Sequence, residues 1–278
     1  MRVNACIVAY DNPLVMLTAA VKSVAQISPS LLNTLYFVDN SSTDRLRKHF
    51  DMTTQYIFSD ENLGFGKGNN IAMQHSVEDE VPYHLLVNPD VYFDEGVVEK
   101  MVDFMDANPD VGLLMPKITY PDGSTQFLCK LLPTPFDLIG RRFFSWGPFR
   151  KYVDKRNDIF ELRGLCYEQQ VDVPVLSGSF MLIRTSVIRE VGLFDERYFM
   201  YLEDFDLCRR IGEVSRTTYF PEVSVVHEYK KGSYFNRRLF KHHISSAIKY
   251  FNKWGWLFDS KRKARNAQCL VDLEKLKG

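Results

Sequence analysis

The chain has 278 residues, of which 45% are hydrophobic and 25% are charged, and its 35 basic and 35 acidic side chains cancel. This length suits one or two domains with a full hydrophobic core, and a net charge of zero offers no overall field that would attract nucleic acid. No stretch approaches the roughly 18 consecutive apolar residues that are needed to cross a bilayer.

Strand-like and helix-like segments alternate through the first half of the chain. The strands are expected at 3–9, 34–38, 55–58, 83–87 and 111–120, and the helices at 13–25, 65–75 and 95–107. This alternation predicts an α/β fold with a mainly parallel central sheet and helices on both faces. In such a sheet, ligands bind beyond the carboxyl ends of the strands.

The second half of the chain is less regular. Residues 121–124 (PDGS) predict a tight turn and a hairpin. The segment 128–172 lacks clean periodicity and is expected to be irregular, a feature typical of functional or mobile segments in a compact domain. Order is expected again at a strand over 175–183, a helix from 185, and a short strand near 217–220.

The last forty residues are expected to be helical, basic and aromatic. From residue 230 to residue 265 there are eleven Lys or Arg side chains and a single acid, Asp259. Such a segment either packs its aromatic side chains on the domain or attaches to an anionic membrane surface. We therefore divide the chain into a domain at 1–235 and a basic helical extension at 236–278.

Cysteine usage and the first residues indicate a compartment. The five cysteines are dispersed without a CxxC pair, which predicts reduced, buried thiols rather than a disulfide framework. The opening MRVNACIVAYDN contains only a short apolar run, interpreted as a strand and not as a signal peptide. The expected location is the cytoplasm, including the inner face of the cell membrane.

Two carboxylates follow predicted buried strands. Asp39 begins the polar run DNSSTD, where it could hold a nucleotide base or ribose, or form an Asx turn or a helix cap. Asp90 ends the run LLVNPD, where a hard oxygen ligand could hold Mg²⁺ or Mn²⁺ against a substrate diphosphate. A simple Asn-Pro-Asp turn explains the second run equally well.

Three further motifs could carry chemistry or structure. Residues 61–73 (ENLGFGKGNNIAM) hold three glycines that suit close backbone approach to a phosphate or sugar, or a flexible turn before a helix. In YLEDFDL, 201–207, the acids could cap a helix or include a general base. His227 follows an apolar stretch, as either a structural residue or a metal ligand near Asp90.

The order of these motifs resembles the family 2 glycosyltransferases of the GT-A fold, which are inverting enzymes that use nucleotide sugars. The resemblance covers about residues 1–235 and is carried by IVAYDNP, VDNSSTD, NLGFGKGNN, LLVNPDV and the long stretch SGSFMLIRTSVIREVGLFDERYFMYLEDFDLCRRI. It is strongest to bacterial rhamnosyltransferases that build O-antigen or cell-wall polysaccharide. One position departs from the family's DxD motif, because Asn88 replaces its first acid.

The resemblance implies a role for each motif. The nucleotide sugar would be bound by Ala9, Tyr10, Asp39, Gly64, Asn69, Asn88 and Asp90. The Mg²⁺ or Mn²⁺ ion would be held by Asp90 and His227, and the acceptor side would be lined by Gly178 and Ser179. Asp204 would be the general base, with Glu203 as its rival.

The resemblance also implies substrates and partners. The expected donor is dTDP-rhamnose, and the expected acceptor is a saccharide, free or linked to a polyprenyl diphosphate. A UDP-hexose or UDP-N-acetylhexosamine transferase of the same fold is the alternative within the enzyme class. An inert saccharide-binding module is the alternative outside it. No nucleic-acid partner is expected, whereas peripheral membrane contact through the basic extension is.

Overall fold

The computed structural model describes residues 2–50, 54–140, 150–164, 167–228 and 237–276. The predicted boundary between 1–235 and 236–278 lies outside the described residues. Cys166 and most of the motif HEYKKGS at 227–233 also lie outside them.

The first half of the chain forms the parallel part of the sheet, as predicted. Its elements are β1 (Val3–Ala9), α1 (Leu14–Ala25), β2 (Leu32–Asp39), the short 3₁₀ turn η1 (Arg47–His49), β3 (Thr54–Phe58), α2 (Phe65–Glu78) and β4 (Tyr83–Val87). The strands lie in the order β3-β2-β1-β4, and each neighbouring pair is parallel. Because the strands are parallel, β1, β2 and β4 end at the same edge of the sheet.

Helices cover both faces of this half. Side chains along β1 alternate between faces, as in any strand. Ile7 belongs to the core cluster that contains Leu17 of α1, whereas Cys6 packs with Ala72 of α2. The sheet is therefore buried on both sides, which explains the nearly continuous apolar runs that mark its strands.

The second half adds strands of both directions. Its elements are β5 (Val91–Tyr92), α3 (Val97–Ala107), β6 (Val111–Thr119), β7 (Val171–Asp172), β8 (Phe180–Arg184), α6 (Thr185–Val191), α7 (Glu203–Ile211) and β9 (Arg216–His227). The sheet continues from β4 in the order β8-β6-β9-β5, with β7 beside β9. Strand β8 is antiparallel to both β4 and β6, so the predicted mainly parallel sheet is mixed at this end.

Residues 121–124 form the predicted turn, because the N–H of Tyr120 donates to the carbonyl of Ser124 and Thr119 bridges to Thr125. The expectation that 128–172 would be irregular throughout is wrong. The segment contains the π-helical turn η2 (Phe136–Gly140), helix α5 (Arg150–Phe160) and strand β7. Helix α5 buries only two of its side chains, so its apolar face is too narrow for the sequence pattern to reveal.

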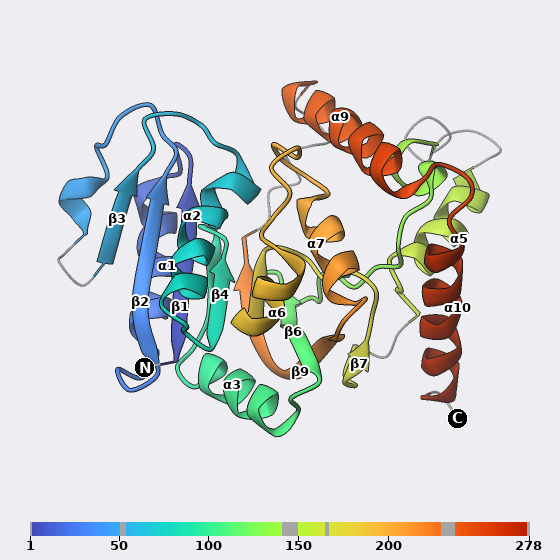
Figure 1. Ribbon diagram of the computed structural model, residues 1–278, viewed down its shortest axis with the longest axis horizontal. Coiled ribbons are helices and arrows are strands. Elements are labelled where there is room, and N and C mark those ends of the chain that lie inside the picture. Colours follow the sequence, from blue (N-terminus) through green and yellow to red (C-terminus); the bar gives the residue numbers. More distant parts are fainter. Residues whose placement is uncertain (1, 51–53, 141–149, 165–166, 229–236, 277–278) are drawn as a thin grey trace.

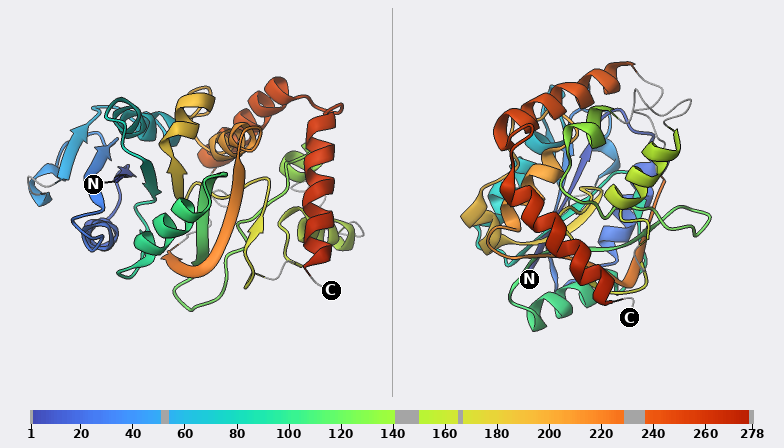
Figure 2. Two further views of the ribbon diagram at one scale, coloured as in Figure 1. Left: turned by 60° about the horizontal axis from the view of Figure 1, so that its bottom comes forward. Right: turned by 90° about the vertical axis from the view of Figure 1, so that its right-hand side faces the viewer.

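The C-terminal segment folds into two helices, as predicted, namely α9 (Arg237–Trp254) and α10 (Ser260–Lys275). Figure 1 shows α9 crossing above α7 and α10 descending along the side of the molecule, and the two views of Figure 2 agree. Tyr250 and Phe251 of α9 are completely buried. Among the described residues, no helix is both long enough and apolar enough to cross a membrane.

The cysteines that the structure describes are buried free thiols, as expected: Cys6, Cys129, Cys208 and Cys269. Burial raises the pKa of Cys208 and of Cys269 to about 12, so both stay protonated at neutral pH. Neither thiol has the thiolate character that a reactive cysteine needs.

Candidate active site

Asp39, at the end of β2, is fully buried and its carboxylate is held by the protein itself. One oxygen accepts the N–H of Ser41 at 3.0 Å, and the other accepts the hydroxyl of Tyr56. Ala9 lies directly opposite Asp39 in the sheet and is also buried, whereas Tyr10 is 45% exposed. Asp39 therefore positions Ser41 and Tyr56. Of the predicted nucleotide-binding residues, Tyr10 is the one whose side chain is largely exposed to solvent.

The glycine-rich run begins α2, and each glycine permits close packing within the protein. Gly64 has φ +81°, and a Cβ there would lie 2.1 Å from the carbonyl oxygen of Phe199. Gly66 packs on Phe194 and Gly68 on Val8, with would-be Cβ contacts of 3.1 and 2.8 Å. The glycines therefore dock α2 against β1 and against the 194–199 segment.

Polar contacts tie the same turn to the end of β2. The side-chain amide of Asn40 donates to the carbonyl of Gly64 at 3.1 Å. Asn69, which is almost fully buried, donates to the carbonyl of Phe65 one turn earlier. The predicted donor-binding residues Ala9, Asp39, Gly64 and Asn69 thus form one cluster at the carboxyl edge of the sheet.

Asp90 and His227 meet because β5 pairs with the end of β9, with Val91 opposite His227. An oxygen of Asp90 lies 3.3 Å from Nε2 of His227, and the Asp90 side chain remains 21% exposed. The other ring nitrogen, Nδ1, contacts the side-chain oxygen of Gln126 at 3.0 Å, while the Gln126 amide donates to the His227 carbonyl. The imidazole is thereby fixed with Nε2 directed at the carboxylate.

This pair fits a divalent cation. Carboxylate oxygen and imidazole nitrogen suit Mn²⁺, and oxygen ligands suit Mg²⁺. Nearby, Oδ1 of Asn88 is buried and has no hydrogen-bond partner among the described residues. No group of three or more His, Cys, Asp and Glu side chains in the described part of the chain could hold a metal by itself. An ion at Asp90 and His227 would need ligands from a substrate.

Asp204 and Glu203 occupy the first turn of α7. The Asp204 carboxylate accepts the N–H of Gly178 at 3.1 Å and that of Phe205 at 2.9 Å. Glu203 is buried, and its Oε2 has no hydrogen-bond partner in the described chain. The two neighbouring carboxylates therefore differ, because Asp204 binds the backbone of Gly178, whereas Oε2 of Glu203 has no partner in the described chain.

The difference appears in their pKa values. Burial, together with the neighbouring Asp204, raises the pKa of Glu203 to about 8. Burial also raises the pKa of Asp204, but the Gly178 N–H and the positive charge of Lys130 oppose this shift. Burial thus raises the pKa of both carboxyl groups, and at Asp204 the positive charge of Lys130 opposes the shift.

A chain of contacts joins the two halves of the site. The N–H of Asn88 donates to the carbonyl of Ser179 at 2.9 Å, and Gly178 binds Asp204. A Cβ at Gly178 would lie 3.2 Å from Cβ of Asp204 and 3.3 Å from the Phe65 ring. The predicted acceptor residues Gly178 and Ser179 thus lie between the loop that follows β4, Asp204 and the start of α2.

Asp206, the third acid of the YLEDFDL motif, is structural. It is fully buried and accepts hydrogen bonds from Nε of Arg210 at 2.9 Å and from the indole N–H of Trp254 at 2.7 Å. The ammonium group of Lys253 lies 2.7 Å from the same carboxylate. Asp206 therefore anchors α9 on α7 and takes no direct part in the site.

Sequence reasoning missed three residues that support the site: Tyr56, Gln126 and Lys130. Each acts on a predicted residue across a long stretch of chain, and none belongs to a motif. A lone Gln after a turn or a lone Lys in a segment without periodicity carries no signal that a pattern could detect.

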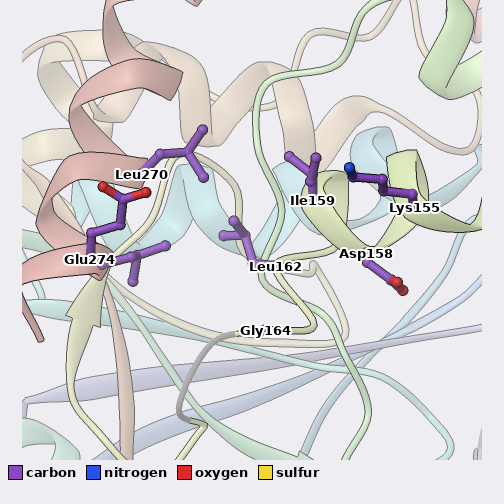
Figure 3. A pocket seen from close by; sticks show the side chains of 8 residues that line it. Lys155, Asp158, Ile159, Leu162, Gly164, Leu270 and Glu274 are labelled. Atoms are coloured by element: carbon purple, nitrogen blue, oxygen red, sulfur yellow. The ribbon is translucent and has the colours of Figure 1, made fainter. Parts of the chain in front are cut away.

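Two cavities lie outside this cluster. One, of about 380 Å³, is lined by Asp44, Arg45, Arg47 and Lys48 and is open to solvent. The other, of about 250 Å³, lies between α5 and α10 (Figure 3). In Figure 3 the side chains of Leu162, Ile159 and Leu270 converge on it, with Glu274 and Lys155 at its sides. Neither cavity shares a residue with the candidate site.

Known proteins with similar sequences include two rhamnosyltransferases. An N-acetylglucosaminyl-diphospho-decaprenol L-rhamnosyltransferase of Mycobacterium tuberculosis is 34% identical over 174 residues, which are 59% of this chain and 53% of that protein. The rhamnosyltransferase WbbL of Escherichia coli K12 is 28% identical over 195 residues, covering 67% of this chain and 69% of WbbL. The chain thus spans about half the length of the mycobacterial relative.

A solved structure and a family model identify the fold and the family of the chain. A crystal structure of GalNAc-T7 with UDP, GalNAc and Mn²⁺ superposes with a TM-score of 0.62 at 16% identity, covering 82% of this chain and 43% of that one. The family model described as Glycosyl transferase family 2 matches residues 5–192, which is more than half of the chain. These matches confirm the resemblance drawn from the motifs, and the chain belongs to glycosyl transferase family 2, with the GT-A fold.

Proposed function

We propose that this protein is an inverting glycosyltransferase that moves L-rhamnose from dTDP-rhamnose to a hydroxyl of a lipid-diphosphate-linked saccharide. The observation that carries the proposal is the position of Asp204. Its carboxylate is held by two backbone N–H groups, next to the Gly178–Ser179 turn that leads to Asn88 and Asp90. The rhamnosyltransferase names of the two relatives support the choice of sugar.

In the proposed reaction, Asp204 accepts the proton of the acceptor hydroxyl. The hydroxyl oxygen forms a bond to the anomeric carbon as the bond from that carbon to the diphosphate breaks on the opposite face. The electron pair of the broken bond leaves with the nucleoside diphosphate, and the configuration inverts. A positioned general base contributes roughly 10²–10⁴-fold to such a step.

Asp204 is a better base than Glu203 on physical grounds. A base must be deprotonated before it acts, and the raised pKa of about 8 leaves Glu203 mostly protonated at neutral pH. The backbone hydrogen bonds to Asp204 and the positive charge of Lys130 favour its ionised form. Glu203 would instead pack against the start of α2. A Cβ added at Gly66 would lie 3.6 Å from the Cβ of Glu203.

Asp90 and His227 would hold the divalent ion, and Asn88 would face the same substrate group. Bound there, Mg²⁺ or Mn²⁺ would neutralise charge on the leaving diphosphate. Gln126 would keep the imidazole in place through Nδ1. Asp39 would act through Tyr56 and the Ser41 turn, leaving contact with the nucleotide to Tyr10 and its neighbours.

A lipid-linked acceptor implies work at a membrane surface, which we place at the cytoplasmic face. The basic C-terminal helices would supply the peripheral contact, because exposed cations are attracted to anionic lipid. The mycobacterial relative, whose name specifies a decaprenol-linked acceptor, supports this part of the proposal.

A donor screen tests the function first. With Mn²⁺ present, dTDP-rhamnose at a hundred times its Kd should stabilise the fold by about 2.7 kcal/mol, and GDP-sugars should not. Transfer to a soluble saccharide diphosphate should give a product of inverted anomeric configuration by NMR. Asp204→Asn should lower kcat by about 10²–10⁴-fold. Selective stabilisation by UDP would replace the donor with a UDP-sugar, and no nucleotide binding would favour an inert saccharide-binding module.

A further inference from the structure

The turn between α9 and α10 is apolar and exposed, which the sequence of the extension does not reveal. Of its side chains, Phe258 is 94% exposed, Leu257 is 69% exposed and Trp256 is 39% exposed. The other aromatic residues at the end of α9 point inward, since Tyr250 and Phe251 are buried and Trp254 bonds to Asp206. Three consecutive residues therefore form the exposed apolar surface of the turn itself.

The turn is held rigidly at both ends. Before it, Gly255 ends α9 with φ +99°, and its N–H donates to the carbonyl of Phe251 at 2.8 Å. After it, Asp259 caps α10 by accepting the N–H of Arg262. The same carboxylate forms a buried, two-pronged ion pair with Arg209 of α7, with distances of 2.7 and 2.8 Å. Ordering this turn on a partner would cost little entropy, because it is already ordered.

Within the turn, Trp256 is the side chain that contacts α9. Its ring lies 5.2 Å from that of Phe251, and its indole N–H donates to the side chain of Asn252 at 2.9 Å. Among the described residues, no ring contact or hydrogen bond holds the side chains of Leu257 and Phe258, which are largely in solvent. These two side chains therefore form the tip of the turn.

Cations flank the tip along the chain, and one of them, Lys261, is paired with the exposed Glu213 at 3.1 Å. Lys261 and Lys263 follow it on the first turn of α10, and both are exposed. The solvent-facing side of α9 carries the exposed residues Arg237, Arg238, Lys241, Ile248 and Lys249. Over the described residues 237–263, the acid is Asp259, which is buried against Arg209. This surface is therefore complementary to an anionic one.

We propose that the turn at 256–258 inserts into the surface of an anionic lipid bilayer, with the cations of α9 and α10 lying against the headgroups. A rigid apolar tip flanked by Lys and Arg matches the chemistry of interfacial membrane contacts. The inference rests on the proposed use of a lipid-linked acceptor. Because α9 packs on the 199–201 segment and on α7, insertion would bring the candidate site close to the membrane (Figure 1).

Binding to vesicles tests the inference with the full chain. The double variant Leu257→Ser/Phe258→Ser should bind vesicles of phosphatidylcholine and phosphatidylglycerol at least tenfold more weakly than the wild type. Val15→Ser is the matched control, because Val15 is 84% exposed on α1, away from the turn, and it should bind as the wild type does. Lys241→Gln/Lys263→Gln should lose about tenfold on the same vesicles and little on phosphatidylcholine alone.

Two outcomes would overturn the inference. One is vesicle binding that is absent in the wild type or equal in the wild type and the double variant. The other is a change of oligomeric state in the double variant by size-exclusion chromatography, which would make the turn a protein contact.

Sugar transfer to a soluble acceptor without vesicles separates this test from the proposed function. The double variant should match the wild type there. If the wild type binds vesicles through the turn but transfers no sugar, the membrane contact of the turn is supported and the proposed function is refuted.

Discussion

Replacing Glu203 by Gln tests the electrostatics of the candidate site through stability alone. Glu203 is 6% exposed, and burial with the adjacent Asp204 raises its pKa from 4.5 to about 8. The folded protein therefore keeps a proton that the unfolded chain releases above about pH 4.5. Between these two values, unfolding releases a proton, so the free energy of unfolding falls as the pH rises.

The size of the effect follows from the length of the pH window. Each pH unit inside it lowers the free energy of unfolding by about 1.4 kcal/mol for one proton. Over the two units from about pH 5.5 to about pH 7.5, Glu203 contributes a loss of about 3 kcal/mol. Glutamine cannot ionise, so Glu203→Gln should gain that amount relative to the wild type across the window.

Urea denaturation at several pH values, with the slope m held common, measures the difference. Any cost of burying the glutamine amide is independent of pH and shifts the whole curve without changing its slope. Parallel curves for the variant and the wild type would show that Glu203 is ionised in the folded protein. That result would remove the reason for preferring Asp204 as the base, and Glu203→Gln would then be expected to lose activity.

Three other substitutions probe the fold and the site. Gly64→Ala should destabilise the protein by at least about 1–3 kcal/mol in urea, because its positive φ and the carbonyl beside it exclude a Cβ. Asp259→Ala leaves Arg209 buried without its partner and should cost about 3–5 kcal/mol by the same measurement. Gln126→Ala releases His227 and should weaken Mn²⁺-dependent donor binding about 10–100-fold in a metal titration; unchanged metal dependence would contradict the proposed ion site.

The parallel half of the fold could be predicted because each of its parts is visible locally. Strands β1, β2 and β4 are short, continuous apolar runs, and α1 begins directly after Pro13. Such signals depend only on neighbouring residues. The Asp39 position followed from the same logic, because a polar run after a buried strand marks a sheet edge.

The mixed half depends on contacts between distant residues. The pairing of Val91 with His227 joins residues more than a hundred positions apart through a strand of two residues. No periodicity can reveal a strand that short, so from the residues alone His227 could be only one of two things, a structural residue or a metal ligand near Asp90, and the family resemblance favoured the ligand. The aromatic residues at the end of α9 and in the turn after it give a second example. They follow one another in the sequence, but only the structure separates the buried Phe251 from the exposed Phe258.

Helix α7 explains why the C-terminal helices are not a detachable extension. Its first turn carries Glu203 and Asp204, and its next turns carry Asp206 and Arg209, which bind α9 and α10. Truncation after residue 236 would remove Trp254 and Lys253, leaving the Asp206 carboxylate buried beside Arg210 alone and Arg209 without its carboxylate. Such a variant would lose membrane binding and catalysis together through damage to α7. Only substitutions at the exposed tip of the turn can separate the two.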